Sequence, residues 1–172
     1  WGAFDAGRLT EAGRVEGVAG LAPIAQRLTE DTRVVAVLPG EQVALRDIPS
    51  PPKQQAKLKA AAGYLLEDEL AEAVDQLHVA LAAGADGARA YAISKAVMKR
   101  WLDAFAEAGV TVSEMTVDFD VIGGSSGVCV IASDRDRIIA SRGVAGFAAE
   151  IALADIVAPA FLQAAGEAAI VS

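Results

Sequence analysis

The chain has little of several residue types on which catalytic and secreted proteins depend. Its 172 residues include one cysteine, one histidine and 5% aromatic residues. The single cysteine, Cys129, excludes an internal disulfide and fits a reducing compartment. A zinc site is disfavoured because His78 and Cys129 stand far apart in the sequence and neither has a second ligand of its own kind nearby.

The chain also lacks a basic excess and a long apolar run. Fifteen Lys and Arg residues against 23 Asp and Glu give a formal charge of -8, which a nucleic-acid backbone or an anionic membrane surface would repel. No apolar stretch reaches the roughly 18 residues that span a bilayer, because Asp155 and Pro159 interrupt the longest one. We expect a soluble cytoplasmic domain that binds no nucleic acid. Because the sequence starts abruptly at Trp1, we also expect a part of a longer protein.

Hydrophobic residues make up 53% of the chain, enough for one domain or two small lobes with a core. The pattern predicts a hairpin that turns at residues 5–7, a short helix over residues 21–28 and strands at residues 77–81 and 88–93. It also predicts a helix from about Lys53 and a second helix that starts after Ser94 and ends at Gly109. This alternation indicates two related α/β lobes.

The stretch "VVAVLPGEQVALRDIP", residues 34–49, has two interpretations. It could be a strand that leads into a ligand-binding loop, or a plain hairpin. The run at residues 34–38 is typical of a strand buried on both faces. After a turn at Pro39 and Gly40, Val43 and Leu45 should share one face and Ile48 the other. We favour the hairpin, because nothing there is equipped to hold a ligand.

In the last third, residues 110–122 are predicted to be extended and "GVCVIASDRDRIIASR" to form a hairpin with a charged turn. A helix is predicted from about Gly146 to Pro159. The glycine-rich stretch "VIGGSSGVCVIAS" could cradle a phosphate through its backbone N–H groups. It has no lysine and leads into a strand, so we interpret it as a structural turn.

Five acidic residues form the one candidate partner site. Leu66, Leu70, Val74 and Leu77 recur at helical spacing, and the acids fall on the opposite, outward face of that predicted helix. Carboxylates can bind Mg²⁺ or do acid–base work, but an outward face is solvated by default. We keep one functional hypothesis for it, a docking surface for a basic partner. This acidic segment comprises Glu67, Asp68, Glu69, Glu72 and Asp75.

Three further candidates have structural interpretations. His78 and Asp75 could form a general base, but no partnered nucleophile is apparent, so local hydrogen bonding is favoured. "SDRDR", residues 133–137, is typical of a solvated hairpin tip, and its arginines argue against an open cation site. Cys129 alternates with apolar neighbours, which indicates a buried, inert thiol. No catalytic, cofactor-binding or metal-binding residue is therefore predicted, and a small-molecule α/β enzyme is disfavoured.

The order of segments resembles the cytoplasmic domain of the general secretion pathway protein L family of bacterial type II secretion. The likeness rests on "VVAVLPGEQVALRDIPSPPKQQAKLKAAAGYLLEDELAEAVDQLHVAL", including its "LEDELA" run and histidine-led strand. It continues in "SKAVMKRWLDAFAEAGVTVSEMTVD" and "RGVAGFAAEIALADI", the latter similar to a closing Gly-Phe-Ala helix of that family. It covers roughly residues 33–156. No single motif is specific for the family, but the order and spacing of the segments are.

The resemblance implies a fold class: an α/β, actin-like ATPase fold of two ribonuclease H-like lobes that is catalytically inactive. The first lobe would span residues 1–120, and the second lobe with a C-terminal helix residues 121–172. An actin-like site needs glycine-rich phosphate hairpins. The turn "SDRDR" has no glycine, and its arginines would fill the phosphate space, while "DAGR" is too short to grip a phosphate.

The resemblance also implies a scaffold with no cofactor. Family members hold the secretion ATPase, the E component, at the cytoplasmic face of the inner membrane and pair with the M component. Their membrane attachment is a single transmembrane helix, which together with a periplasmic domain would be missing from this chain. A homodimer is left open. The alternative is an actin-like, nucleotide-binding scaffold of pilus assembly, which would need glycine in both phosphate hairpins.

Overall fold

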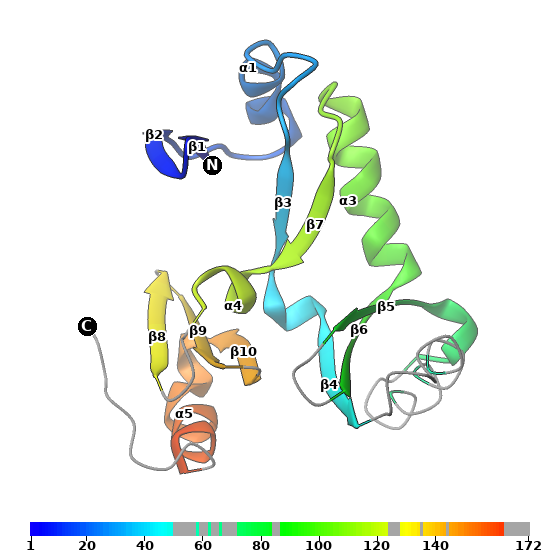
Figure 1. Ribbon diagram of the computed structural model, residues 1–172, viewed down its shortest axis with the longest axis vertical. Helices are drawn as coiled ribbons and strands as arrows, with labels where there is room; N and C mark the ends of the chain where they lie inside the picture. The colour runs from blue at the N-terminus through cyan, green and yellow to red at the C-terminus, as the bar shows by residue number, and fades with distance from the viewer. Residues whose placement is uncertain are drawn as a thin grey trace. The chain divides into compact units, whose positions relative to one another are not determined.

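The computed structural model describes residues 1–49, 58, 62, 66, 72–83, 87–123, 128–134, 136–143 and 145–163, and Figure 1 shows its elements. The chain divides into two compact units. The first comprises Trp1–Val35 and Lys99–Glu114, and the second Ala36–Met98 and Met115–Ser172. The expected lobe boundary between residues 120 and 121 falls inside the second unit, and that division stays a prediction. Within the described residues, no helix has the length and hydrophobicity to cross a membrane.

The first unit opens with the predicted hairpin. Strands β1 (Gly2–Asp5) and β2 (Arg8–Ala12) pair antiparallel, so this prediction is confirmed. Ala6 and Gly7 both have positive φ angles, of 46° and 79°, as a two-residue turn of this hand requires. The phosphate-loop candidate "DAGR" is therefore a tight turn.

The next helical segment is shorter than predicted. A 3-10 turn, η1 (Val18–Leu21), leads into a single turn of helix, α1 (Ala22–Ala25). Pro23 lies in the first turn of α1, where its missing N–H costs no hydrogen bond.

The clearest predicted helix is confirmed as α3 (Lys95–Glu107), which begins directly after Ser94. Gly109 has φ of 72° and donates its N–H to the Ala106 carbonyl at 3.0 Å, and Val110 donates to the Phe105 carbonyl at 2.8 Å. This pair of bonds is a Schellman end, which needs a left-handed residue. Leu102, predicted on the core side, is 48% exposed because it lies at the edge of the apolar stripe.

Two predictions about residues 34–49 are wrong. Strand β3 (Val35–Leu38) pairs with β7 (Glu114–Val117) and buries one face only, since Val35 and Val37 are nearly half exposed. The expected hairpin does not form either, because β4 (Ala44–Pro49) pairs with a different strand, β6. The 3-10 turn η2 (Gly40–Gln42) joins β3 to β4.

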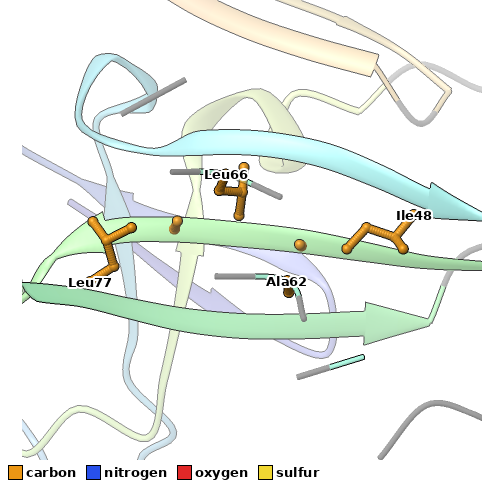
Figure 2. Packing of buried hydrophobic residues seen from close by; sticks show 6 residues of the cluster. Ile48, Ala62, Leu66 and Leu77 are labelled. Atoms are coloured by element: carbon orange, nitrogen blue, oxygen red, sulfur yellow. The ribbon is translucent and has the colours of Figure 1, made fainter. Parts of the chain in front are cut away.

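In the second unit, β5 (Leu77–Ala83) and β6 (Gly87–Ser94) confirm both predicted strands and form a three-stranded antiparallel sheet in the order β4–β6–β5. One face of this sheet packs on the helical positions Ala62 and Leu66, which are fully buried (Figure 2). The faces of β4 are as predicted: Ile48 lies in this core, whereas Leu45 packs against a second cluster.

The predicted helical stripe that ends at Leu77 is wrong at its C-terminal end. Glu72 lies in a bend, η4 (Val74–Gln76) is a 3-10 turn, and Leu77 already belongs to β5. Leu77 is still buried with Leu66, since a strand can bring an apolar residue to the same core that helical spacing predicted. Apart from residues 58, 62 and 66, the helix predicted from Lys53 lies outside the described residues.

After β7, the predicted extended segment instead contains a single helical turn, α4 (Asp118–Val121). The predicted charged hairpin is confirmed as β8 (Cys129–Asp134) and β9 (Arg137–Arg142). They form a second three-stranded sheet with β10 (Ala145–Glu150), in the order β10–β9–β8.

The helix predicted from Gly146 is wrong, because residues 145–150 pair with β9 along their whole length. Helical structure begins only at η5 (Ile151–Leu153) and continues in α5 (Ala154–Gln163). Gly146 also brings β10 close to α4. A Cβ atom there would lie 2.6–2.9 Å from Phe119 side-chain atoms, so the close packing of β10 on α4 requires glycine.

We predict that Gly146→Ala lowers the free energy of unfolding by about 1–3 kcal/mol, the usual cost of overpacking a core. Because the Phe119 Cβ is itself only 2.9 Å from the added atom, rotation of the ring cannot relieve the clash. Urea unfolding followed by circular dichroism measures the change. Gly123→Ala is the comparison, since a Cβ atom there would meet one carbonyl oxygen at 3.3 Å and no side chain, and we expect a smaller loss than for Gly146→Ala. Equal effects of the two substitutions would contradict the prediction.

Candidate functional site

The charged residues that the fold brings together surround α4. The segment Asp118-Phe119-Asp120 follows β7 directly, and its central ring is 2% exposed. Asp118 is also buried, at 8% exposure, although carboxylates are rarely buried unless they are paired. Each aspartate is paired with an arginine from a different sheet, so two arginine clusters can be distinguished.

The first cluster is centred on Arg137 at the start of β9. Its guanidinium donates to both carboxylate oxygens of Glu41, from Nε to Oε1 at 2.5 Å and from Nη2 to Oε2 at 2.6 Å. The same Nη2 donates to Asp118 Oδ2 at 2.5 Å. The other oxygen of Asp118, Oδ1, accepts the backbone N–H groups of Phe119 at 2.8 Å and Gly40 at 3.2 Å. Both oxygens of a buried carboxylate are thereby satisfied.

In this cluster the charged forms of Glu41 and Arg137 are both stabilised. The hydrogen bonds from Arg137 lower the pKa of Glu41 below its ordinary value, against the opposing effect of partial burial. The hydrogen bond to Glu41, followed by that to Asp118, raises the pKa of Arg137. A carboxylate with a lowered pKa is a weak proton acceptor, so Glu41 is poorly suited to general-base catalysis.

The second cluster is centred on Arg89 in β6. Its Nη1 donates to Asp120 Oδ1 at 3.2 Å and to the Tyr91 hydroxyl at 3.3 Å, and the hydroxyl in turn donates to Asp120 Oδ2 at 2.8 Å. A longer bond of 3.4 Å joins Arg89 Nε to the more exposed Asp47. The four side chains come from β4, β6 and α4.

Burial is the largest influence on the two central groups of this cluster. It raises the pKa of the Tyr91 hydroxyl. The hydrogen bond from Arg89 opposes this increase and the bond to Asp120 adds to it, so the pKa stays raised and Tyr91 remains neutral and can donate to Asp120. Burial disfavours the charged form of Arg89 and by itself would lower its pKa. Its hydrogen bond to Tyr91 and the charges of Asp120 and Asp47 outweigh that opposition and leave its pKa raised.

In both clusters the carboxylates already have arginine partners. Four carboxylates, those of Glu41, Asp47, Asp118 and Asp120, all accept hydrogen bonds from arginine. An arginine at this distance competes with a metal ion for the same oxygens. Within the part of the chain that the structure describes, no three Cys, His, Asp or Glu side chains are grouped so as to bind a metal. The arrangement is suited to holding elements together.

The acidic segment predicted from the sequence is only partly described. Glu67, Asp68 and Glu69 lie outside the described residues. Glu72 and Asp75 are both exposed, but they occupy a bend and a 3-10 turn and not the outward face of one helix. Asp75 accepts a bond from Lys95 Nζ at 2.6 Å through its backbone carbonyl, and its exposed carboxylate accepts one from Gln76 Nε2 at 3.1 Å. Its use as a docking surface stays a prediction.

The other sequence candidates have structural positions. His78 is exposed on β5, Cys129 is 1% exposed in β8, and the glycine-rich turn at residues 124–127 lies outside the described residues. The expectation of a solvated tip at "SDRDR" is wrong for Arg137, whose side chain is 28% exposed in the first cluster.

Sequence reasoning missed both clusters. A signal was present, because two aspartates flank an aromatic residue directly after a strand and an aspartate is rarely buried without a partner. The groups that meet in each cluster, however, lie apart in the sequence: Arg89 is 31 residues from Asp120, Arg137 is 19 residues from Asp118, and Glu41 is 96 residues from Arg137.

Comparisons with known proteins agree with one another over nearly the whole chain. The family model for type II secretion system protein L matches residues 3–166. The structure is similar to the cytoplasmic domain of EpsL, an inner-membrane component of the type II secretion system of Vibrio cholerae. That match has a TM-score of 0.79 and 21% identity, and covers 98% of this chain and 74% of the other.

A weaker similarity is to a Bacteroides thetaiotaomicron protein of actin-like ATPase fold and unknown function. Its TM-score is 0.44 at 11% identity, and it covers 86% of this chain and 60% of the other. Among curated proteins, none matches the chain.

We predict that Arg137→Ala destabilises the protein by about 3 kcal/mol, because it leaves the Asp118 carboxylate buried without its cation. Urea unfolding at pH 7 measures this loss. Lys99→Ala is the matched control, since it breaks a salt bridge to Asp103 in which both side chains are more than 60% exposed. That pair should contribute about 0.5 kcal/mol or less. A loss for Arg137→Ala no larger than for the control would show that the cluster does not stabilise the fold.

The lowered pKa of Glu41 predicts an acid-sensitive contribution to stability. Its pKa in the unfolded chain is near 4.5 and in the folded chain is lower, so the contribution is complete above 4.5 and is lost as the pH falls through the folded value. The difference in unfolding free energy between the parent protein and Glu41→Gln should be constant from pH 7 to about 5 and should narrow below that. Urea unfolding at several pH values tests this. A difference that stays constant at low pH would contradict it, and Glu30→Gln, at an exposed position, controls for loss of one negative charge.

Proposed function

The chain belongs to the family of type II secretion system protein L, and from that premise we propose that it is a non-catalytic cytoplasmic scaffold for the secretion ATPase. The observation that carries the proposal is the family match over residues 3–166. The similarity to the EpsL cytoplasmic domain over 98% of the chain supports the same assignment at the level of the fold. The protein is accordingly a component of the type II secretion system associated with the inner membrane.

In the proposed role, the domain recruits the E component, an ATPase, and couples it to the membrane complex. The M component is a second proposed partner, and a homodimer is compatible with the role. The protein would act on the cytoplasmic face of the bacterial inner membrane, and a transmembrane helix outside the present sequence would provide the attachment.

The two arginine clusters support a binding role over a catalytic one. A hydrolytic site needs carboxylates that are available to a metal ion, a water molecule or a substrate. The carboxylates gathered around α4 instead have arginine partners within 3.4 Å. We propose that the fold is of the actin-like type without its ATPase activity.

The two hairpin turns that would hold phosphate groups in an actin-like site support the loss of nucleotide binding. The turn between β1 and β2 has two residues, too few to surround a phosphate. At the other turn, Arg137 is bonded to Glu41 and Asp118, so its charge is not available to a phosphate group.

Net charge supports a basic docking partner. The formal charge of -8 would accelerate encounter with a partner whose docking face is basic, and salt would weaken this effect. Among the proposed contact residues, Glu72 and Asp75 have exposed side chains next to the edge strand β5. We propose that the acidic segment defined above, residues 67–75, contributes to this docking surface.

The proposal is tested by mixing the chain with the N-terminal domain of the secretion ATPase from the same organism, followed by size-exclusion chromatography with light scattering. We expect a stable complex at micromolar concentrations. Separate elution of the two proteins at these concentrations would overturn ATPase recruitment while leaving the family assignment intact.

We further predict that Glu72→Lys/Asp75→Lys weakens the ATPase complex roughly tenfold at low salt and less at high salt, as expected for charge complementarity at an interface. Isothermal titration calorimetry at two salt concentrations gives the affinities. Glu30→Lys/Asp31→Lys makes the same change in net charge at two exposed positions of the first unit and serves as control. Equal losses in both variants would indicate an effect of net charge alone and would exclude the acidic segment as the docking surface.

A calorimetric titration with Mg-ATP tests the absence of nucleotide binding. We expect no saturable heat at micromolar to low millimolar nucleotide, because Arg137 is already neutralised by two carboxylates. Saturable binding in the micromolar range would instead favour a nucleotide-binding scaffold of the pilus-assembly type.

A further inference from the structure

Three consecutive side chains of α4 contact three different parts of the second unit. Asp118 binds Arg137 of β9 and the Gly40 N–H of η2. Phe119 packs where Gly40 and Gly146 lack a side chain. Asp120 binds Arg89 and Tyr91 of β6. One helical turn therefore bonds to the β4–β6–β5 sheet on one side and to the β10–β9–β8 sheet on the other.

No strand is shared between these two sheets in the described part of the chain, so backbone hydrogen bonds of the sheets do not join them. Among the described residues, side chains and one backbone N–H around α4 and η2 make contacts that connect them. The apolar part is a cluster of buried Val117, Phe119 and Ile139 with partly buried residues of β4, β6 and β10 around it. Figure 1 shows α4 next to β9, directly after β7.

The α4 turn has too few residues to be stable by itself, because a helix of one turn has nucleation cost without propagation. Its geometry must come from the groups that it contacts. The contacts on its two sides are directional, charge-assisted hydrogen bonds, which fix orientation more strictly than apolar packing does.

We propose that α4 is an electrostatic joint that makes the two sheets of the second unit fold and open as one cooperative body. Asp118 is its link to the β10–β9–β8 sheet and Asp120 is its link to the β4–β6–β5 sheet. When both links are lost, the β10–β9–β8 sheet opens independently of the other sheet. The joint is a property of the fold, and it stands whether or not the chain recruits an ATPase.

Native-state hydrogen exchange of the whole chain, measured by mass spectrometry, tests the joint. The variant Asp118→Asn/Asp120→Asn keeps the side-chain shapes and removes both charges. We expect amides of β8, β9 and β10 to exchange roughly tenfold faster or more, relative to those of β5 and β6, because sub-global opening is then separate from global unfolding. The control Asp103→Asn changes an exposed salt bridge of α3 and should alter neither sheet.

Two results would overturn the joint: unchanged exchange in the double variant, or acceleration by the same factor in both sheets. If the double variant does not fold, Arg89→Lys, Arg137→Lys and their combination provide a second test, since lysine keeps the charge but loses the planar fork. The two arginines bind different aspartates, so a joint predicts that their effects on unfolding free energy are not additive. Additive effects would contradict the proposal.

Discussion

The buried carboxylate of Asp118 is the constraint on which the second unit depends. A carboxylate at 8% exposure must be compensated, and Arg137 and two backbone N–H groups provide the compensation. Because Gly40 supplies one of those N–H groups and Glu41 shares the arginine, the same requirement fixes the path of the chain between β3 and β4. Phe119 follows Asp118 directly, so the position of the carboxylate also sets the position of the buried Phe119 ring, which packs against Gly146.

Pairing of this kind separates two uses of charge in one acidic protein. The four carboxylates around α4 are paired with two arginines inside the second unit, which leaves a formal charge of -2 there, and these groups serve the structure. The rest of the chain, with 13 Lys and Arg against 19 Asp and Glu, carries a formal charge of -6, and this charge can act on a partner over a distance. A scaffold needs both: a rigid body that does no chemistry, and a surface whose charge selects a partner.

Predictions from the sequence succeeded where a local cause decides the structure. The end of α3 at Gly109 could be predicted because a left-handed residue there favours glycine, and β5, β6 and the β8–β9 hairpin because of their composition and alternation. They failed where a distant contact decides. Residues 145–150 include three alanines, whose composition favours a helix as much as a strand, and pairing with β9 determines the outcome. The local sequence predicts that Arg137 is a solvated hairpin residue, but the fold brings Glu41 and Asp118 within hydrogen-bonding distance of it.

The sequence by itself determined the secretion-family order of segments, the acidic balance, the solitary Cys129 and most of the elements of the second unit. These follow from composition, periodicity and turn residues, all of which act over a few positions. Only the tertiary structure decided which charges meet. Glu41 and Arg137 are 96 residues apart along the chain but 2.5 Å apart in space, because the packing of β9 and η2 around α4 joins them. Local sequence patterns carry no information about such a pairing, because each of the two side chains could equally well be solvated at the surface without the other.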